Sequence, residues 1–181
     1  MKTVCLVALV ALSGCVTTRA TTSPNANLSQ YRTFGWYQPP NPTQNQIAFE
    51  QGPSAQTIKN ELARNFAQKG LTEVSTNPEL LVSYHVKTQQ KYDVTDWGYP
   101  GGWWYGWGYP GGVSVNEYTQ GTIFVDLIDP KTNQIVWRGT ASAVVNHPEN
   151  PNQEKIAKSI DKLMKKLPAS QFATAPSPAR M

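Results

Sequence analysis

The stretch that decides the fold is residues 118–145, which read YTQGTIFVDLIDPKTNQIVWRGTASAVV. Apolar residues alternate with more polar ones before residue 129, the period-2 pattern of a strand with one buried face. Residues 129–133, DPKTN, are typical of a turn. The chain then returns as a second strand, so the stretch predicts an antiparallel hairpin. The residues expected to face inward are Ile123, Val125 and Leu127 on the first strand, and Ile135, Trp137, Gly139, Ala141 and Ala143 on the second.

The two faces of this hairpin have different expected roles. We expect Trp137 to lie in the core, and the small residues that follow it to leave room for a packed helix. Arg138 lies on the outward face and is expected to pair with Asp126 across the hairpin.

Two further strands are expected earlier in the chain. Residues 79–92 alternate regularly and form the clearest strand of the sequence. Residues 31–37 form a shorter strand in which Phe34 and Trp36 share a face, and the prolines that follow end it. The apolar face of the longer strand is expected to hold Leu80, Val82, Tyr84 and Val86.

A helix is predicted over residues 55–69. Ser54 suits its N-cap, and Gly70 and Leu71 suit a Schellman ending in which Leu71 contacts Phe66. The helix has an apolar residue at every fourth position, which predicts one buried face. These residues are Ile58, Leu62 and Phe66.

A second helix is predicted from Asn150, its expected N-cap, to about Leu167. Pro168 ends it, and Lys165 and Lys166 suit the negative end of its dipole. Its apolar stripe consists of Ile156, Ile160, Leu163 and Leu167.

The order of these elements predicts an α+β fold. We expect a mainly antiparallel sheet of four to five strands with two helices packed on one face. The other face of the sheet is more polar, so we expect it to be solvated.

The N-terminus has the features of a targeting segment. Lys2 is followed by an uninterrupted apolar run over residues 4–12, too short to span a bilayer. Residues 12–15, LSGC, closely resemble the lipobox of bacterial lipoproteins. The resemblance implies cleavage between Gly14 and Cys15, diacylglycerol on the Cys15 sulfur and acylation of the new amino group. The alternative is an ordinary cleaved signal peptide with an incidental cysteine.

The remaining chain divides around one domain. Residues 1–14 are the expected leader, and residues 15–27 form a flexible tether from lipidated Cys15 to a single domain over 28–168. Residues 169–181 are expected to be a disordered tail. Because residue 16 is Val and not acidic, the lipoprotein resemblance implies an anchor in the outer membrane, with the domain facing the periplasm.

An uncharged segment over residues 97–116, WGYPGGWWYGWGYPGGVSVN, interrupts the predicted strands and contains four of the six Trp residues. It is open to three interpretations: a low-complexity insertion that packs on its own sheet, rings that stack on envelope sugars or enter the membrane interface, or a surface that docks a partner. Its candidate binding residues are Trp97, Tyr99, Trp103, Trp104, Tyr105, Trp107 and Tyr109.

Composition argues against several functions. Sixteen basic against twelve acidic residues give a net charge of +4, with no basic cluster that would indicate nucleic-acid binding. Both cysteines, Cys5 and Cys15, precede the domain, and His85 and His147 lack partners at metal-ligand spacing, so we expect no metal and no cofactor.

Motifs for catalysis are weak. Residues 106–111 match GxGxxG without the strand and helix that a dinucleotide site needs, and Ser159 and Lys162 match SxxK late in a helix. Asp126 and Asp129 suit capping of a strand end and a turn. We therefore expect a protein that is not an enzyme.

The chain also resembles the bacterial lipoprotein family called domain of unknown function 4136. The resemblance covers nearly all of residues 28–168 and implies the same fold and compartment. The family commonly carries a Gly/Tyr/Trp-rich segment before the strand that begins at Gly121, and it has no established catalytic residues to transfer. The segments that carry the resemblance are residues 31–36, 69–71, 77–84, 121–129 and 136–141, which read YRTFGW, KGL, NPELLVSY, GTIFVDLID and VWRGTA.

Three functions follow in order of preference. The first is a non-enzymatic outer-membrane lipoprotein that binds an envelope partner through the aromatic segment and the exposed sheet face. The second is a module that binds peptidoglycan through the same rings, and the third is an envelope hydrolase.

Overall fold

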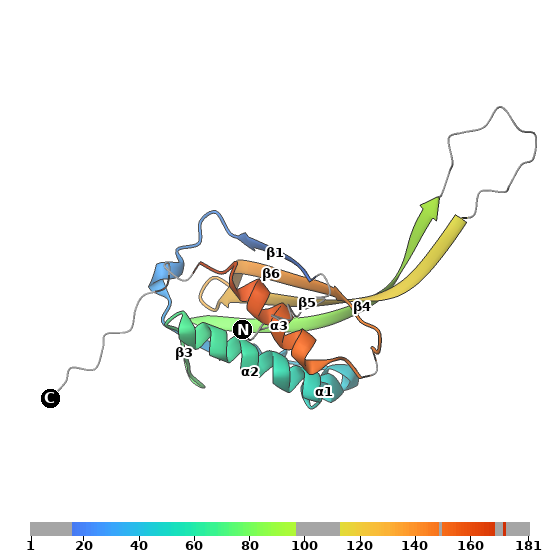
Figure 1. Cartoon of the computed structure of the whole chain (residues 1–181). Coiled ribbons are helices and arrows are strands. Elements are labelled where there is room, and N and C mark those ends of the chain that lie inside the picture. Colours follow the sequence, from blue (N-terminus) through green and yellow to red (C-terminus); the bar gives the residue numbers. More distant parts are fainter. Residues whose placement is uncertain (1–15, 97–112, 149, 169–171, 173–181) are drawn as a thin grey trace, which may run out of the picture.

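A computed structural model describes residues 16–96, 113–148, 150–168 and 172. The fold is α+β, as the sequence predicts, with a six-stranded sheet in the order β1-β6-β5-β4-β2-β3 (Figure 1). The sheet is mixed but mostly antiparallel, and it carries three α-helices where the sequence indicated two. The predicted leader with Gly14 and Cys15, the segment 97–112 and nearly all of the predicted tail lie outside the described residues.

The predicted hairpin is confirmed as β5 (Val113–Asp129) and β6 (Gln134–Val144). Ile123, Val125, Leu127 and Trp137 are buried as expected. Ile135, which was expected to face inward, is instead 40% exposed. The reason is a bulge between Leu127 and Ile128, which leaves Val136 as an extra residue on β6 and buries it beside Trp137.

Helix α2 (Pro53–Gln68) ends as the sequence predicts. The Leu71 N–H donates to the Phe66 carbonyl at 3.0 Å, the Gly70 N–H donates to the Ala67 carbonyl at 3.0 Å, and Gly70 has a φ of 87°. This is the Schellman arrangement, and it needs glycine because of the positive φ. The N-cap, however, is Gly52 and not Ser54, because Pro53 occupies the first helical position.

A short helix α1 (Gln44–Glu50) precedes α2 and was not predicted. Its N-terminus is a capping box in which the Gln46 N–H donates to the Thr43 hydroxyl and the Thr43 N–H donates to the Gln46 side chain. The helix reaches the sheet through Phe49, whose ring lies 6.4 Å from that of Tyr84 on β4.

Helix α3 (Gln153–Met164) lies beside α2 over the sheet. Its N-cap is Asn152, whose side chain accepts from the Lys155 N–H at 2.9 Å, so the expected cap at Asn150 is wrong by two positions. The buried residues Ile160, Leu163 and Met164 face the core.

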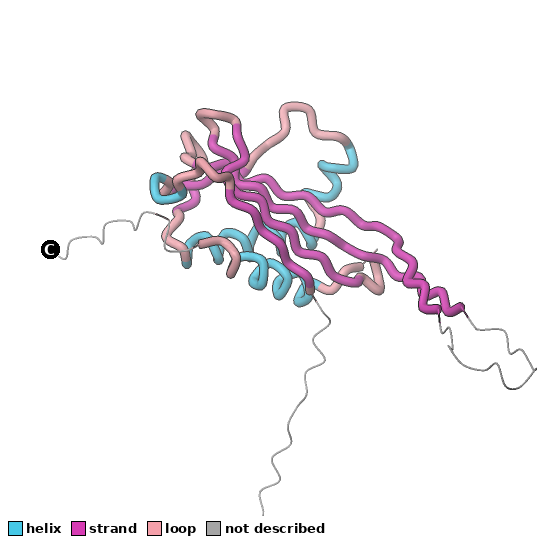
Figure 2. The backbone as a smooth tube through the Cα atoms, turned by 90° about the horizontal axis from the view of Figure 1, so that it is seen from above, coloured by secondary structure: helices cyan, strands magenta, loops and turns pink. Residues whose placement is uncertain are grey.

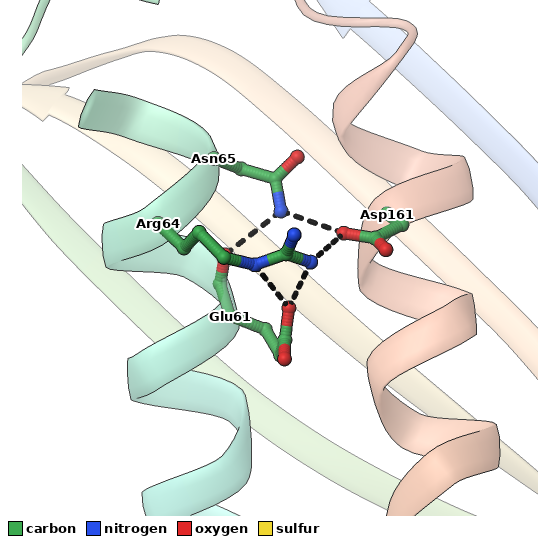
Figure 3. Close-up of polar contacts among 4 residues, drawn as sticks. All are labelled: Glu61, Arg64, Asn65 and Asp161. Carbon is green, nitrogen blue, oxygen red and sulfur yellow. Dashed lines mark hydrogen bonds and ion pairs between the residues drawn. The ribbon is translucent and has the colours of Figure 1, made fainter. Parts of the chain in front are cut away.

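A polar cluster joins the two long helices (Figure 3). Asp161 on α3 accepts from Arg64 at 2.7 Å and from the Asn65 amide at 2.8 Å, both on α2. Arg64 also contacts Glu61, one turn earlier on α2. The carboxylate of Asp161 is therefore directed toward α2.

Residues placed in the tether by the sequence belong to the sheet. Strand β1 (Thr17–Thr22) pairs antiparallel with β6 from Thr17↔Ser142 to Thr22↔Trp137. β-Branched threonines favour this extended conformation, and their pairing covers an edge of β6 that would otherwise stay open. The expectation of a flexible tether over 15–27 is therefore wrong for this part of it.

The other side of the sheet contains its parallel pairs. Strand β2 (Thr33–Trp36) pairs parallel with β4 (Leu80–Asp96) at one edge and with the two-residue strand β3 (Thr72–Glu73) at the other. A 3₁₀ turn, η1 (Leu28–Gln30), connects β1 to β2 and buries Leu28.

The core lies between the sheet and the helices α2 and α3 (Figure 2). Gly139 on β6 leaves space for the side chains of Trp137 and Leu163. A Cβ at residue 139 would lie 2.3 Å from the Trp137 ring and 2.9 Å from Leu163 on α3. The expectation that small residues on β6 make room for a helix is confirmed at this position. The core also includes Phe172, which is 6% exposed and falls in the predicted tail.

Candidate functional site at the ribbon end of the sheet

The longest strands, β4 and β5, continue beyond the rest of the sheet. Strand β6 pairs with β5 only as far as Gln120↔Val144, whereas β4 and β5 remain paired for seven more positions, from Gln90↔Thr119 to Asp96↔Val113. We call this part the ribbon (Figure 1). At about 3.4 Å per residue it extends about 24 Å from the domain.

The ribbon carries exposed apolar side chains. Tyr92 is 62% exposed and Val115 is 57% exposed. A two-stranded ribbon buries little by itself and gains stability from contacts with other elements. These two side chains are apolar surface that the rest of the described domain leaves uncovered.

The aromatic binding residues predicted from the sequence fall between the two strands of the ribbon. Trp97, Tyr99, Trp103, Trp104, Tyr105, Trp107 and Tyr109 all lie outside the described residues. Strand β5 already begins at Val113, so the predicted loop boundary at residue 116 is wrong by four residues. The segment joins Asp96 to Val113 at the far tip of the ribbon.

A mainly apolar cleft of about 670 Å³ opens at the base of the ribbon. The helices stop short of the end of the sheet there, and Val86 on β4 is left 37% exposed. Gln153 joins the two sides of the cleft, since its side chain accepts from Thr57 at 2.7 Å and donates to Ser54 at 3.4 Å. The apolar lining includes Phe49, Ile58, Val86, Ile123, Ala143 and Ile156. The volume is in the range of small-ligand sites.

The N-terminal end of the described chain lies at this same end of the sheet. Val16 is 9% exposed, and its carbonyl accepts from the Lys162 ammonium on α3 at 2.5 Å. The next residue, Thr17, pairs with Ser142 near the end of β6. The described chain thus enters the domain at the ribbon end of the sheet, and Cys15 precedes Val16 in the sequence.

The candidate acid and base groups occupy the open face of the sheet. Asp126 and Arg138 form the predicted pair, with bonds of 2.6 and 2.7 Å from the guanidinium to the two carboxylate oxygens. This pairing raises the pKa of Arg138. The His85 ring stacks on Phe124 with centroids 4.6 Å apart. Each of these groups thus has a structural contact.

Asp129 caps the turn of the hairpin as expected. Its carboxylate accepts from the Lys131 N–H at 2.8 Å and from the Tyr31 hydroxyl at 3.0 Å. Burial opposes ionisation of Asp129, but these hydrogen bonds outweigh it and lower the pKa of the carboxyl. Burial, and after it the same contact with Asp129, raises the pKa of Tyr31 against an opposing hydrogen bond with Gln30.

The remaining sequence motifs do not form a common site. The Ser159 hydroxyl donates to the Lys155 carbonyl, whereas the Lys162 ammonium donates to Val16. Within residues 16–96, 113–148, 150–168 and 172, no three His, Cys, Asp or Glu side chains gather closely enough to hold a metal ion. His147 lies at the rim of the cleft, far along the sheet from the Asp129 turn.

We expect His85 to make the domain less stable as the pH falls below about 6.5. Partial desolvation lowers the pKa of His85 from 6.5, although the residue as a whole is exposed and Asp126 partly offsets the effect. The folded state then binds fewer protons than the unfolded chain, so stability that is full above pH 6.5 is lost as the pH falls through the lowered pKa. Thermal melts between pH 7.5 and 5 should show a smaller loss for His85→Phe, which keeps a ring on Phe124. An equal loss in both proteins would contradict this assignment.

Three parts of the site have only weak signals in the sequence. Threonines at residues 17–22 favour a strand, and the spacing T-x-x-Q at residues 43–46 indicates a capping box. The cleft has no local signal in the sequence, because it forms where elements of different length meet.

Among the described residues, none of the helices combines the length and apolar character needed to cross a bilayer.

The fold and its site define a small α+β domain with a projecting ribbon and a mainly apolar cleft at the base of that ribbon. The chain belongs to the family described as Domain of unknown function (DUF4136), whose model matches residues 18–169. The resemblance noted from the sequence is therefore confirmed for the family. No curated protein matches the chain.

One solved structure shares the fold, and a second protein shows weaker similarity, both at low sequence identity. A PDZ domain protein from Parabacteroides distasonis matches with a TM-score of 0.56 and 12% identity, over 85% of this chain and 36% of that one. This chain thus spans about a third of that protein. The PelC dodecamer from Paraburkholderia phytofirmans, in two crystal forms, matches with TM-scores of 0.45 and 0.46 and 16% identity, over 89% of this chain and 100% of that one.

Proposed function

We propose that this protein is a non-enzymatic outer-membrane lipoprotein that faces the periplasm and binds an envelope partner at the ribbon end of its domain. The observation that carries the proposal is the position of β1. Because Val16 is buried and Thr17 is already paired, a lipid on Cys15 would hold the ribbon end of the sheet close to the bilayer. Two or more acyl chains are needed for such an anchor to be stable.

The anchor predicts a complete change of location for one substitution. Cys15→Ala removes the acylated sulfur, so the protein should move from the membrane fraction to the soluble fraction. Cys5→Ala is the matched control, because Cys5 lies inside the proposed leader, and it should leave the location unchanged. Membrane association of Cys15→Ala would contradict the anchor.

The partner is proposed to meet the ribbon and the aromatic segment that joins its strands. Exposed Tyr92 and Val115 give the ribbon an apolar surface, and the seven paired positions extend it away from the domain. Tryptophan and tyrosine dominate the centres of protein interfaces, which supports docking of an envelope protein by residues 97–112.

A photo-crosslinking amino acid at position 92 in intact cells tests this surface. We expect it to capture a discrete protein partner, and the same amino acid at Lys131, in the turn at the opposite end of β5 and β6, to capture none. Equal capture at both positions would argue against the ribbon as the docking surface.

Peptidoglycan is the second candidate partner, because aromatic rings with polar tips suit the faces of sugars. Retention of the domain on purified sacculi would favour it over a protein partner. Replacing residues 97–112 with a Gly/Ser segment of equal length should abolish that retention. If retention is unchanged, the aromatic segment does not bind the glycan.

A further inference from the structure

Helix α3 carries a row of lysines along its exposed flank, beside β1 and the end of β6. Lys155, Lys158, Lys162 and Lys165 are spaced three or four residues apart, so they share one side of the helix. The buried residues Ile160 and Leu163 and their neighbours form the opposite side. All but Lys155, which is half-buried, are exposed, and Lys166 extends the row. We call these five lysines the basic stripe.

The acidic residues of the helix neutralise little of this stripe. Asp161 is directed toward α2, where it accepts from Arg64 at 2.7 Å and from Asn65 at 2.8 Å. Glu154 makes an exposed ion pair with Lys158 at 2.5 Å. Such exposed pairs contribute little and are readily exchanged for other partners. The stripe therefore keeps an excess of positive charge, whereas the sequence alone assigned Lys165 and Lys166 only to the end of the helix dipole.

The stripe borders the point at which the chain leaves the domain. The Lys162 ammonium donates to the Val16 carbonyl at 2.5 Å, and the Lys155 ammonium donates to the Val144 carbonyl at 2.5 Å, at the end of β6. Cys15 is bonded to Val16. The basic stripe and the proposed lipid attachment site are thus on the same side of α3.

We propose that the basic stripe binds the headgroups of anionic phospholipids in the bilayer that holds Cys15. This inference rests on the proposed function, because the anchor determines which side of the domain meets the membrane. Negative headgroups attract lysines that lie within about 10 Å of them. The stripe then fixes the orientation of the domain, and with it the direction in which the ribbon points.

Vesicle binding by the chain that begins at Val16 tests the stripe without the anchor. Every core residue lies between Val16 and Phe172, so this chain keeps the whole core, and its melting curve checks its fold. We expect it to bind vesicles of three parts phosphatidylethanolamine to one part phosphatidylglycerol at low salt, and not vesicles of phosphatidylcholine. The double substitution Lys158→Gln and Lys165→Gln should weaken vesicle binding about 30-fold. Each lysine near an anionic surface contributes about 1 kcal/mol, and about 2 kcal/mol corresponds to that factor.

The matched control is Arg32→Gln with Lys131→Gln. Both residues are exposed and lie at the end of the sheet opposite the ribbon, and the pair changes the net charge equally. It should leave vesicle binding within twofold. Equal binding to both vesicle types, no binding to either, or an equal loss in the control pair would overturn the proposal. Because Cys15 is absent from this chain, these results are independent of whether Cys15→Ala releases the protein in cells.

Discussion

Replacing Gly139 with alanine is expected to lower the free energy of unfolding by about 3 kcal/mol. The new Cβ would lie 2.3 Å from the Trp137 ring and 2.9 Å from the Leu163 side chain, and both neighbours are fully buried. A close-packed core has no space into which they can move without leaving their rotamers, and such overpacking costs about 1–3 kcal/mol. Chemical denaturation measures the loss.

Gly121 provides the matched control on the neighbouring strand. A Cβ there would lie 2.7 Å from one methyl group of Val145, beside the cleft, where the side chain is only partly buried and has room to rotate. Gly121→Ala should therefore cost less than about 1 kcal/mol. If Gly121→Ala and Gly139→Ala lower the free energy of unfolding equally, the loss arises from replacing any strand glycine and not from the contact with Trp137.

Replacing Trp137 with alanine is expected to cost about 3–5 kcal/mol, because it empties the largest fully buried side chain of the core. Replacement with phenylalanine should cost only about 1 kcal/mol. The Nε1–H of Trp137 is buried without a hydrogen-bond partner among the described residues, and burying an unpaired donor costs about 1–3 kcal/mol. Phenylalanine removes that donor, which offsets part of the lost packing.

The two substitutions should also interact. Phenylalanine lacks the Cζ3 and Cη2 atoms of the indole that a Cβ at residue 139 would meet at 2.9 and 2.3 Å. Gly139→Ala should therefore cost less in the Trp137→Phe protein than in the wild type, and a double-mutant cycle measures the difference. Additive costs would show that Leu163, and not Trp137, resists the added methyl group.

The parts of the fold that follow from local pattern were predictable. Alternation identified the hairpin and β4, and the Gly70 ending of α2 followed from a local motif that needs no partner elsewhere in the chain. Ile135 shows where this reasoning fails, because one extra residue at Val136 reverses the alternation and no signal in the sequence marks the bulge. Strand β1 could not be placed because its partner lies at the other end of the chain.

The candidate site was predictable only in part. The aromatic segment is visible in the composition, and the pairing of Arg138 with Asp126 followed from the register of a hairpin. The cleft and the basic stripe depend on where separate elements stop and meet. In the sequence Lys162 stands out only through an SxxK match late in a helix, whereas the fold places it against Val16, the residue next to the proposed anchor.

The pairing of β1 with β6 also bears on the order in which the molecule folds. The first strand of the chain is completed by the last one, so the sheet cannot close until nearly the whole polypeptide is available. Pairing of such distant segments is slow, because the chain loses much entropy before the contact forms. A polypeptide delivered N-terminus first would therefore keep β1 unpaired until β6, at residues 134–144, has followed.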